Sequence, residues 1–117
     1  MLFRSLPRIV GLPKAKEIMF FGDDLPAADA LRLGIANRVV SSDDLEAVTD
    51  DWARRLAAAP TKAITMTKWL LNRSSESSRQ TALEEEGYAQ ELVNATADSA
   101  EGMQAFVARR APDFRGW

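Results

Sequence analysis

Helix-stop signals divide almost the whole chain into segments with helical spacing, and this pattern restricts the fold more than any other feature. Glycines follow apolar segments at Gly11, Gly22 and Gly34, and a helix that ends in a left-handed residue favours glycine there. Pro60 and Pro112 stop two later segments. Between these signals apolar residues recur every three or four positions, as they do on one face of a helix. The sequence therefore predicts a mainly α fold with about six or seven helices.

Start signals place the individual helices. We expect capping boxes at Asp43 with Glu46 and at Asp98 with Glu101, because each pair has the spacing of a reciprocal helix cap. The expected helices run from Ser5 to Gly11, Pro13 to Gly22, Ala27 to Leu33, Asp43 to Ala59, Thr61 to Asn72, Arg79 to Ala97 and Asp98 to Pro112.

One segment, residues 35–40, is instead typical of a short strand, because it is β-branched and bounded by polar residues. The chain has 117 residues, which is within the size of a single domain. We therefore expect one domain, residues 1–117, that is mainly α with at most one short strand. Several helices carry wide apolar stripes for a chain this small, so we expect some stripes to face another chain.

The composition excludes several kinds of site. The chain has no cysteine and no histidine, which excludes disulfides, a thiol nucleophile and the commonest general base. The net charge of -2 leaves no basic footprint for nucleic acid. No apolar run approaches the roughly 20 residues of a membrane span, and the start lacks the apolar core of a signal peptide. We expect no metal, nucleic-acid or membrane partner and a cytoplasmic location.

Two groups of residues invite a chemical interpretation. Two carboxylates of Glu84–Glu86 suit acid–base work, but adjacent helical residues point in different directions, so a solvated helix face is favoured. Met19, Phe20 and Phe21 suit an acyl pocket, although apolar residues at helical spacing more often form core. Both readings of Met19, Phe20 and Phe21 stay open at this point.

The C-terminal segment combines two arginines with two aromatic residues. Arginine suits phosphate recognition, and aromatic rings stack on a purine. The residues in question are Phe106, Arg109, Arg110 and Phe114. By composition alone, a pair of surface arginines is the favoured interpretation.

Ordered motifs along the chain give a more specific indication. They are Leu-Pro-Arg-Ile-Val-Gly at residues 6–11, a segment ending Asn-Arg-Val-Val at residues 27–40, Asp-x-x-Glu-Gly-Met-x-Ala-Phe at residues 98–106, and Arg-x-Pro-x-Phe at residues 110–114. In order and spacing they resemble the C-terminal part of the enoyl-CoA hydratase/isomerase (crotonase) family, over essentially the whole chain.

This resemblance implies a fold and a division of labour. Members of the family have a spiral of repeated β-β-α turns, followed by an all-helical C-terminal region that builds trimers, often paired into hexamers. This chain resembles that last region. Two glutamates that handle water and the oxyanion hole lie before the segment at residues 6–11 in the family. The resemblance therefore assigns no catalytic residue here and implies that the catalytic part lies upstream and is missing, so that the chain alone is inactive.

The resemblance also implies a ligand. The family's C-terminal Phe-x-x-Lys-Arg-x-Pro-x-Phe segment helps to hold CoA, and Phe106, Arg110 and Phe114 match it, with Arg109 in place of the lysine. We expect a fragment resembling enoyl-CoA hydratase, which hydrates trans-2-enoyl-CoA thioesters. It would supply oligomerisation and part of the CoA-binding surface, with no cofactor. The alternative is a non-catalytic assembly module that oligomerises with a full-length relative. The acyl group, and hydratase against isomerase or dehalogenase, stay open.

Overall fold

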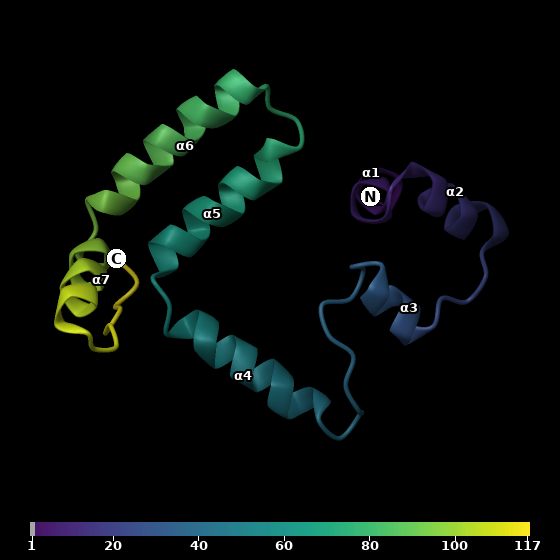
Figure 1. Cartoon of the computed structure of the whole chain (residues 1–117), viewed down its shortest axis with the longest axis horizontal. Coiled ribbons are helices and arrows are strands. Elements are labelled where there is room, and N and C mark those ends of the chain that lie inside the picture. The colour runs from purple at the N-terminus through teal and green to yellow at the C-terminus, as the bar shows by residue number, and fades with distance from the viewer. Residues whose placement is uncertain (1) are drawn as a thin grey trace. The chain divides into compact units, whose positions relative to one another are not determined.

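The computed structural model describes residues 2–117, and its regular elements are all helices (Figure 1). These are α1 (Leu2–Val10), α2 (Leu12–Phe21), α3 (Ala27–Arg32), α4 (Leu45–Ala57), α5 (Thr61–Ser74), α6 (Arg79–Asn94) and α7 (Ala97–Ala108). The mainly α prediction is confirmed. No helix in this part of the chain is long and apolar enough to cross a membrane.

Residues 35–40, the one segment typical of a short strand, do not form one, since residues 2–117 contain no strand. This outcome agrees with the prediction of at most one short strand. The N–H groups of Ile35 and Ala36 instead donate to the carbonyl of Ala30, at 2.9 and 3.1 Å, and close the end of α3. Gly34, with a φ of 76°, makes that reversal possible. A β-branched segment forms a strand only beside a pairing partner, and the described chain offers none.

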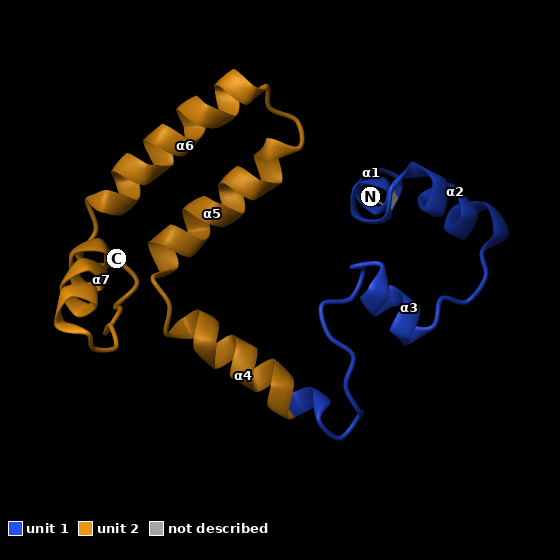
Figure 2. Ribbon diagram, viewed as in Figure 1, with its two compact units in different colours: residues 1–46 blue, residues 47–117 orange. Residues whose placement is uncertain are grey.

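The chain divides into two compact units, residues 1–46 and residues 47–117 (Figure 2). In the first unit α1 packs against α2 and buries Leu6 and Ala15. Gly11, with a φ of 79°, turns the chain between the two helices. The first helix was expected to begin at Ser5, but α1 begins at Leu2, so Ser5 lies inside it.

The second unit is built on a pair of adjacent helices, α5 and α6, and α7 packs against α6 (Figure 1). The buried side chains here are Ala89, Ala105 and Asp98. Arg73 ties α5 to α6, because its Nε donates to Oε1 of Glu85 at 2.8 Å, and this hydrogen bond raises the pKa of Arg73. The same guanidinium lies 5.2 Å from the ring centroid of Trp69, within the range of a cation–π contact.

Neither expected capping box forms, and the side chains that bind N–H groups near these helix starts are Ser41 and Thr96, each two positions before the expected residue. Before α4, the Oγ of Ser41 accepts from the N–H of Asp44 at 3.1 Å. Before α7, the Oγ1 of Thr96 accepts from the N–H of Ser99 at 3.1 Å. Because Thr96 is the cap of α7, α6 ends at Asn94 rather than at the expected Ala97.

Large apolar side chains remain exposed on the helices of both units. Leu56 of α4, Leu71 of α5 and Leu92 of α6 are 58%, 66% and 59% exposed. These three side chains belong to the apolar stripes that the sequence predicted to face another chain.

Candidate functional site

The last residues of the chain run back along α7 and bind to its first turn (Figure 1). Asp98 is only 3% exposed, and its two carboxylate oxygens accept from the N–H groups of Arg115 at 2.7 Å and Gly116 at 2.8 Å. The N–H of Asp98 donates in return to the carbonyl of Trp117 at 3.2 Å. A buried carboxylate is tolerated here because both oxygens have donors.

Glu101, one turn further along α7, holds the beginning of the same tail. Its carboxylate accepts from Arg110, Nη2 to Oε2 at 2.8 Å and Nη1 to Oε1 at 2.5 Å, and from the N–H of Asp113 at 2.7 Å. The Arg110 hydrogen bond, followed by the Asp113 N–H, lowers the pKa of Glu101 to about 2. The same pairing raises the pKa of Arg110. We call Asp98 and Glu101 together the tail clamp.

The turn between α7 and the tail depends on one unusual backbone conformation. Arg109 has a φ of 52° and ends α7 in the left-handed region, where glycine is the usual residue. The N–H of Arg110 then donates to the carbonyl of Ala105 at 3.0 Å and closes the turn. The side chain of Arg109 is exposed, and within residues 2–117 it makes no ion pair or hydrogen bond.

A mainly apolar cavity of about 390 Å³ is lined in part by α7 and by the tail that follows it. Phe106, which is 85% exposed, and Phe114 both line it, one from α7 and the other from the tail. Phe114 lies over Gly102, where an added Cβ would be 3.6 Å from its ring. The other lining residues come from α5, α6 and α7 and the segments that flank them: Pro60, Lys62, Ala63, Val93, Thr96, Asp98, Ser99, Gly102 and Met103.

The structure sorts the four C-terminal candidates into different surroundings. Phe106 and Phe114 share the cavity, Arg109 is exposed at the adjacent turn, and the Nη atoms of Arg110 are bound to Glu101. The sequence reasoning missed both residues of the tail clamp, because it read Asp98 and Glu101 as a helix cap. The sequence did offer one clue: Thr96 is also a good cap residue. If Thr96 caps α7, the carboxylates of Asp98 and Glu101 are available for other partners.

The acyl-pocket candidates lie in the other unit. Met19 and Phe20 line an apolar cavity of about 170 Å³ formed by α1 and α2. Phe21 does not line it and is 74% exposed, and Phe20 is 76% exposed. The interpretation of Phe20 and Phe21 as packed core is therefore wrong for this unit taken by itself.

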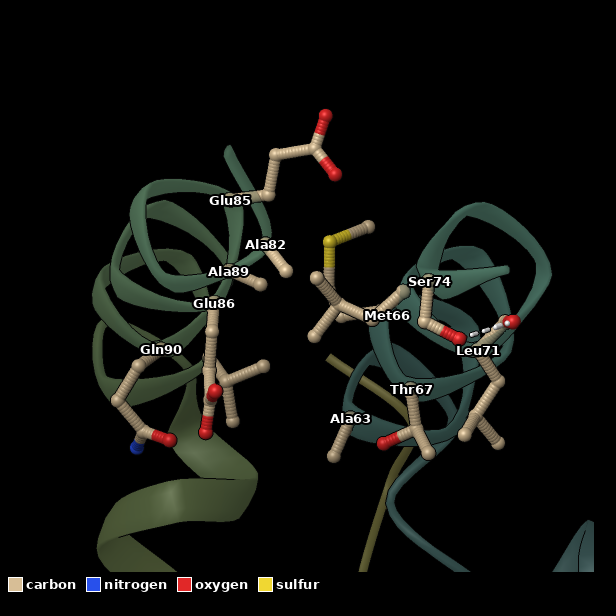
Figure 3. Close-up of a pocket in the computed structure, with 12 residues that line it drawn as sticks. Ala63, Met66, Thr67, Leu71, Ser74, Ala82, Glu85, Glu86, Ala89 and Gln90 are labelled. Atoms are coloured by element: carbon tan, nitrogen blue, oxygen red, sulfur yellow. Dashed lines mark hydrogen bonds between the residues drawn. The ribbon is translucent and has the colours of Figure 1, made fainter. Parts of the chain in front are cut away.

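A larger groove, of about 420 Å³, separates α5 from α6 (Figure 3). Met66 points from α5 into the space between the helices, and Glu86 and Gln90 lie on the α6 wall (Figure 3). Among the described residues, no group of three acidic side chains is arranged to hold a metal ion.

The three consecutive glutamates of α6 do not converge. Glu84 accepts from Gln80 at 2.7 Å, while Glu85, which pairs with Arg73, and Glu86 both line the groove but point in different directions (Figure 3). This divergence agrees with the prediction that the cluster belongs to a helix face and not to an acid–base pair.

Known proteins resemble the chain over nearly its whole length. A family model described as enoyl-CoA hydratase/isomerase matches residues 1–116. The 1,2-epoxyphenylacetyl-CoA isomerase of Escherichia coli is 33% identical over 111 residues, which are 95% of this chain and 42% of that protein. The crotonyl-CoA hydratase of Syntrophomonas wolfei is 32% identical over 111 residues, which are 95% of this chain and 43% of that protein.

Solved structures show the same likeness. The crystal structure of an enoyl-CoA hydratase/isomerase from Cupriavidus metallidurans superposes with a TM-score of 0.92 at 35% identity, over 99% of this chain and 44% of that one. An enoyl-CoA hydratase from Bacillus anthracis gives a TM-score of 0.91 at 30% identity, over 99% of this chain and 45% of that one. The chain thus spans less than half the length of the relatives it matches.

Proposed function

Because this chain belongs to the enoyl-CoA hydratase/isomerase family over residues 1–116, we propose that it supplies the C-terminal helical region of an enzyme that hydrates trans-2-enoyl-CoA thioesters. The match crosses the boundary between the two units without a break, which supports residues 1–117 as one functional region. The resemblance assigns the reacting glutamates and the oxyanion hole to segments before residue 6. The part of this chain in the reaction is therefore ligand binding and assembly.

The observation that carries the binding role is the cavity shared by Phe106 and Phe114, with the exposed Arg109 three residues after Phe106. Two aromatic side chains at one apolar cavity suit the adenine of CoA, which has an apolar face on each side. A guanidinium suits the phosphates. Since Glu101 occupies the Nη atoms of Arg110, we assign the phosphate contact to Arg109 and a supporting role to Arg110.

Titration calorimetry with CoA tests this assignment. We expect a Kd of about 1 mM for the chain alone, because one exposed cavity supplies only part of a binding site. Arg109→Ala should weaken binding and its dependence on salt, because exposed phosphate–guanidinium contacts are screened. Arg54→Ala, which removes an exposed arginine from α4, is the matched control. Equal affinities of the Arg109→Ala variant and the parent chain would refute the assignment.

Assembly is the second part of the proposal. Exposed apolar residues on α4, α5 and α6 support association into a trimer or hexamer, or with a full-length relative as a non-catalytic module. Hydratase assays of the chain alone and mixed with a full-length relative separate these roles. A gain or loss of the relative's activity on mixing would favour the assembly module.

A further part of the proposal concerns the acyl group. We propose that Met19 and Phe20, on the α1–α2 cavity, contact the acyl chain together with the exposed Phe21. Phe20→Ala in the assembled enzyme should raise KM for longer acyl groups more than for crotonyl-CoA. We also propose that the protein is cytoplasmic, and cell fractionation tests this location.

A further inference from the structure

We propose that Asp98 and Glu101 are positioning residues, which hold the C-terminal tail on α7 and thereby place Phe114 at the cavity that Phe106 also lines. Neither residue needs to touch a ligand for this role. Only the identity of the ligand, CoA, rests on the proposed function, since the tail clamp itself is defined by the contacts of α7 with residues 109–117.

Glu101 fixes the tail immediately next to the aromatic contact. Along α7 it directly precedes Gly102, on which the Phe114 ring lies, and its carboxylate binds the N–H of Asp113, which directly precedes Phe114. The hydrogen bond and the ring contact therefore join consecutive residues of α7 to consecutive residues of the tail. Loss of the Glu101 carboxylate would release the backbone at the residue that carries the ring.

Asp98 fixes the far end of the tail. Its two oxygens hold the N–H groups of Arg115 and Gly116, just after Phe114. Phe114 is thus bracketed by one carboxylate contact before it and two after it, all from one helix. An amide at residue 98 would turn an NH₂ donor toward one of these N–H donors, so Asp98→Asn should loosen that end.

Arg110 acts through Glu101. The bidentate pair fixes the carboxylate that receives the Asp113 N–H, so Arg110 supports the position of Phe114 from behind the turn. This assignment separates the two neighbouring arginines: Arg110 supports the tail clamp through Glu101, and Arg109 is left to meet a ligand.

The test compares Glu101→Gln and Asp98→Asn with Glu91→Gln, which removes an exposed carboxylate from α6. Three quantities are measured by NMR on the full chain: amide exchange at Asp113 and Arg115, the NOE between the Gly102 Hα protons and the Phe114 ring, and the Kd for CoA. Amide exchange at Ala89 in α6 reports whether the helices stay folded. Two clamp variants keep the test decisive if Asp98→Asn fails to fold.

We expect Glu101→Gln to speed exchange at Asp113 and weaken CoA binding by about tenfold each, the scale of a lost charge-assisted hydrogen bond. The NOE should disappear while exchange at Ala89 stays unchanged, and Glu91→Gln should change none of these. An unchanged NOE and unchanged tail exchange would overturn the proposal. So would a lost NOE with unaltered CoA affinity. If the parent chain binds no CoA but Glu101→Gln still releases Phe114, the positioning role stands and the proposed CoA site fails.

Discussion

Glu101 and Arg110 face each other across the turn that ends α7, with Arg110 Nη2 2.8 Å from Oε2 of Glu101. They are nine residues apart in the sequence, and the left-handed Arg109 brings them together. Because the same carboxylate also receives the Asp113 N–H, this one ion pair connects the end of a helix to the path of the tail. The tail should therefore respond to changes at either residue.

Acid should release the beginning of the tail. The pKa of Glu101 is lowered from 4.5 to about 2, mainly by Arg110 and then by the Asp113 N–H. A lowered folded-state pKa means that the stabilisation is complete above about pH 4.5 and is lost as the pH falls through 2. The amide shift of Asp113, followed by NMR against pH, should report this change.

Glu101→Gln is the control for the acid titration, and it should remove the transition at Asp113. A transition centred near the ordinary value of 4.5 would show that the ion pair does not persist in solution.

Arg109→Gly should stabilise the chain and weaken ligand binding at the same time. Glycine relieves the left-handed strain at φ 52°, worth about 1 kcal/mol, but removes the guanidinium. Thermal unfolding and CoA titration measure the two effects. Arg109→Ala should weaken binding without the gain in stability. Destabilisation by Arg109→Gly would mean that the side chain packs against a neighbour.

Substitutions at Gly102 should distinguish helix propensity from ring placement. Gly102→Ala adds a Cβ at 3.6 Å from Phe114, an ordinary contact, and should raise the free energy of unfolding by about 0.5–1 kcal/mol. Gly102→Leu should push Phe114 off α7 and weaken CoA binding. Gly87→Ala in α6, which has no neighbour within 4 Å, is the matched control. A stable Gly102→Leu variant with full CoA affinity would contradict the placement of Phe114.

Exposed apolar stripes should make the chain associate. Light scattering should show a mass above that of the monomer, or a dye such as ANS should bind to apolar surface that stays open. Trp52→Glu, which places a charge on the exposed apolar face of α4, should reduce either signal. A stable monomer that binds no dye at high concentration would contradict this expectation.

The chain alone should not hydrate crotonyl-CoA at a useful rate. Loss of one oxyanion donor costs about a hundredfold or more, and the resemblance places every such donor before residue 6. A spectrophotometric assay of enoyl-CoA loss measures the rate. Turnover near the typical value of about 10 per second would show that a catalytic group lies within these residues.

Local signals were sufficient where a helix ends in glycine. Gly22 and Gly34 have φ values of 66° and 76°, and α2 and α3 end beside them as the sequence predicted. Such stops depend on one residue's backbone freedom, which is visible in the sequence. The sequence does not show which of two neighbouring residues caps α7, because Thr96 and Asp98 are both of types that cap helices well. The tail amides decide between them, and they lie more than a dozen residues away.

The cavity that Phe106 and Phe114 line was only partly predictable. Their residue types and the motif around them indicated a ligand surface, but the path of the tail that brings Phe114 to the cavity depends on Glu101 and on the left-handed Arg109. A left-handed arginine has no sequence signature, since glycine or asparagine usually occupies that position. The sequence therefore placed the four candidates on one segment, while the different surroundings of Arg109 and Arg110 required the fold.

The first turn of α7 has a consequence for where an anion can settle. The positive end of a helix dipole normally attracts phosphate through its free N–H groups. Here the N–H of Asp98 donates to the carbonyl of Trp117, and the N–H of Ser99 donates to the Oγ1 of Thr96. The carboxylate of Asp98 lies at the same end of the helix. The chain has thus neutralised its own helix terminus, and an incoming phosphate must find its positive charge on side chains.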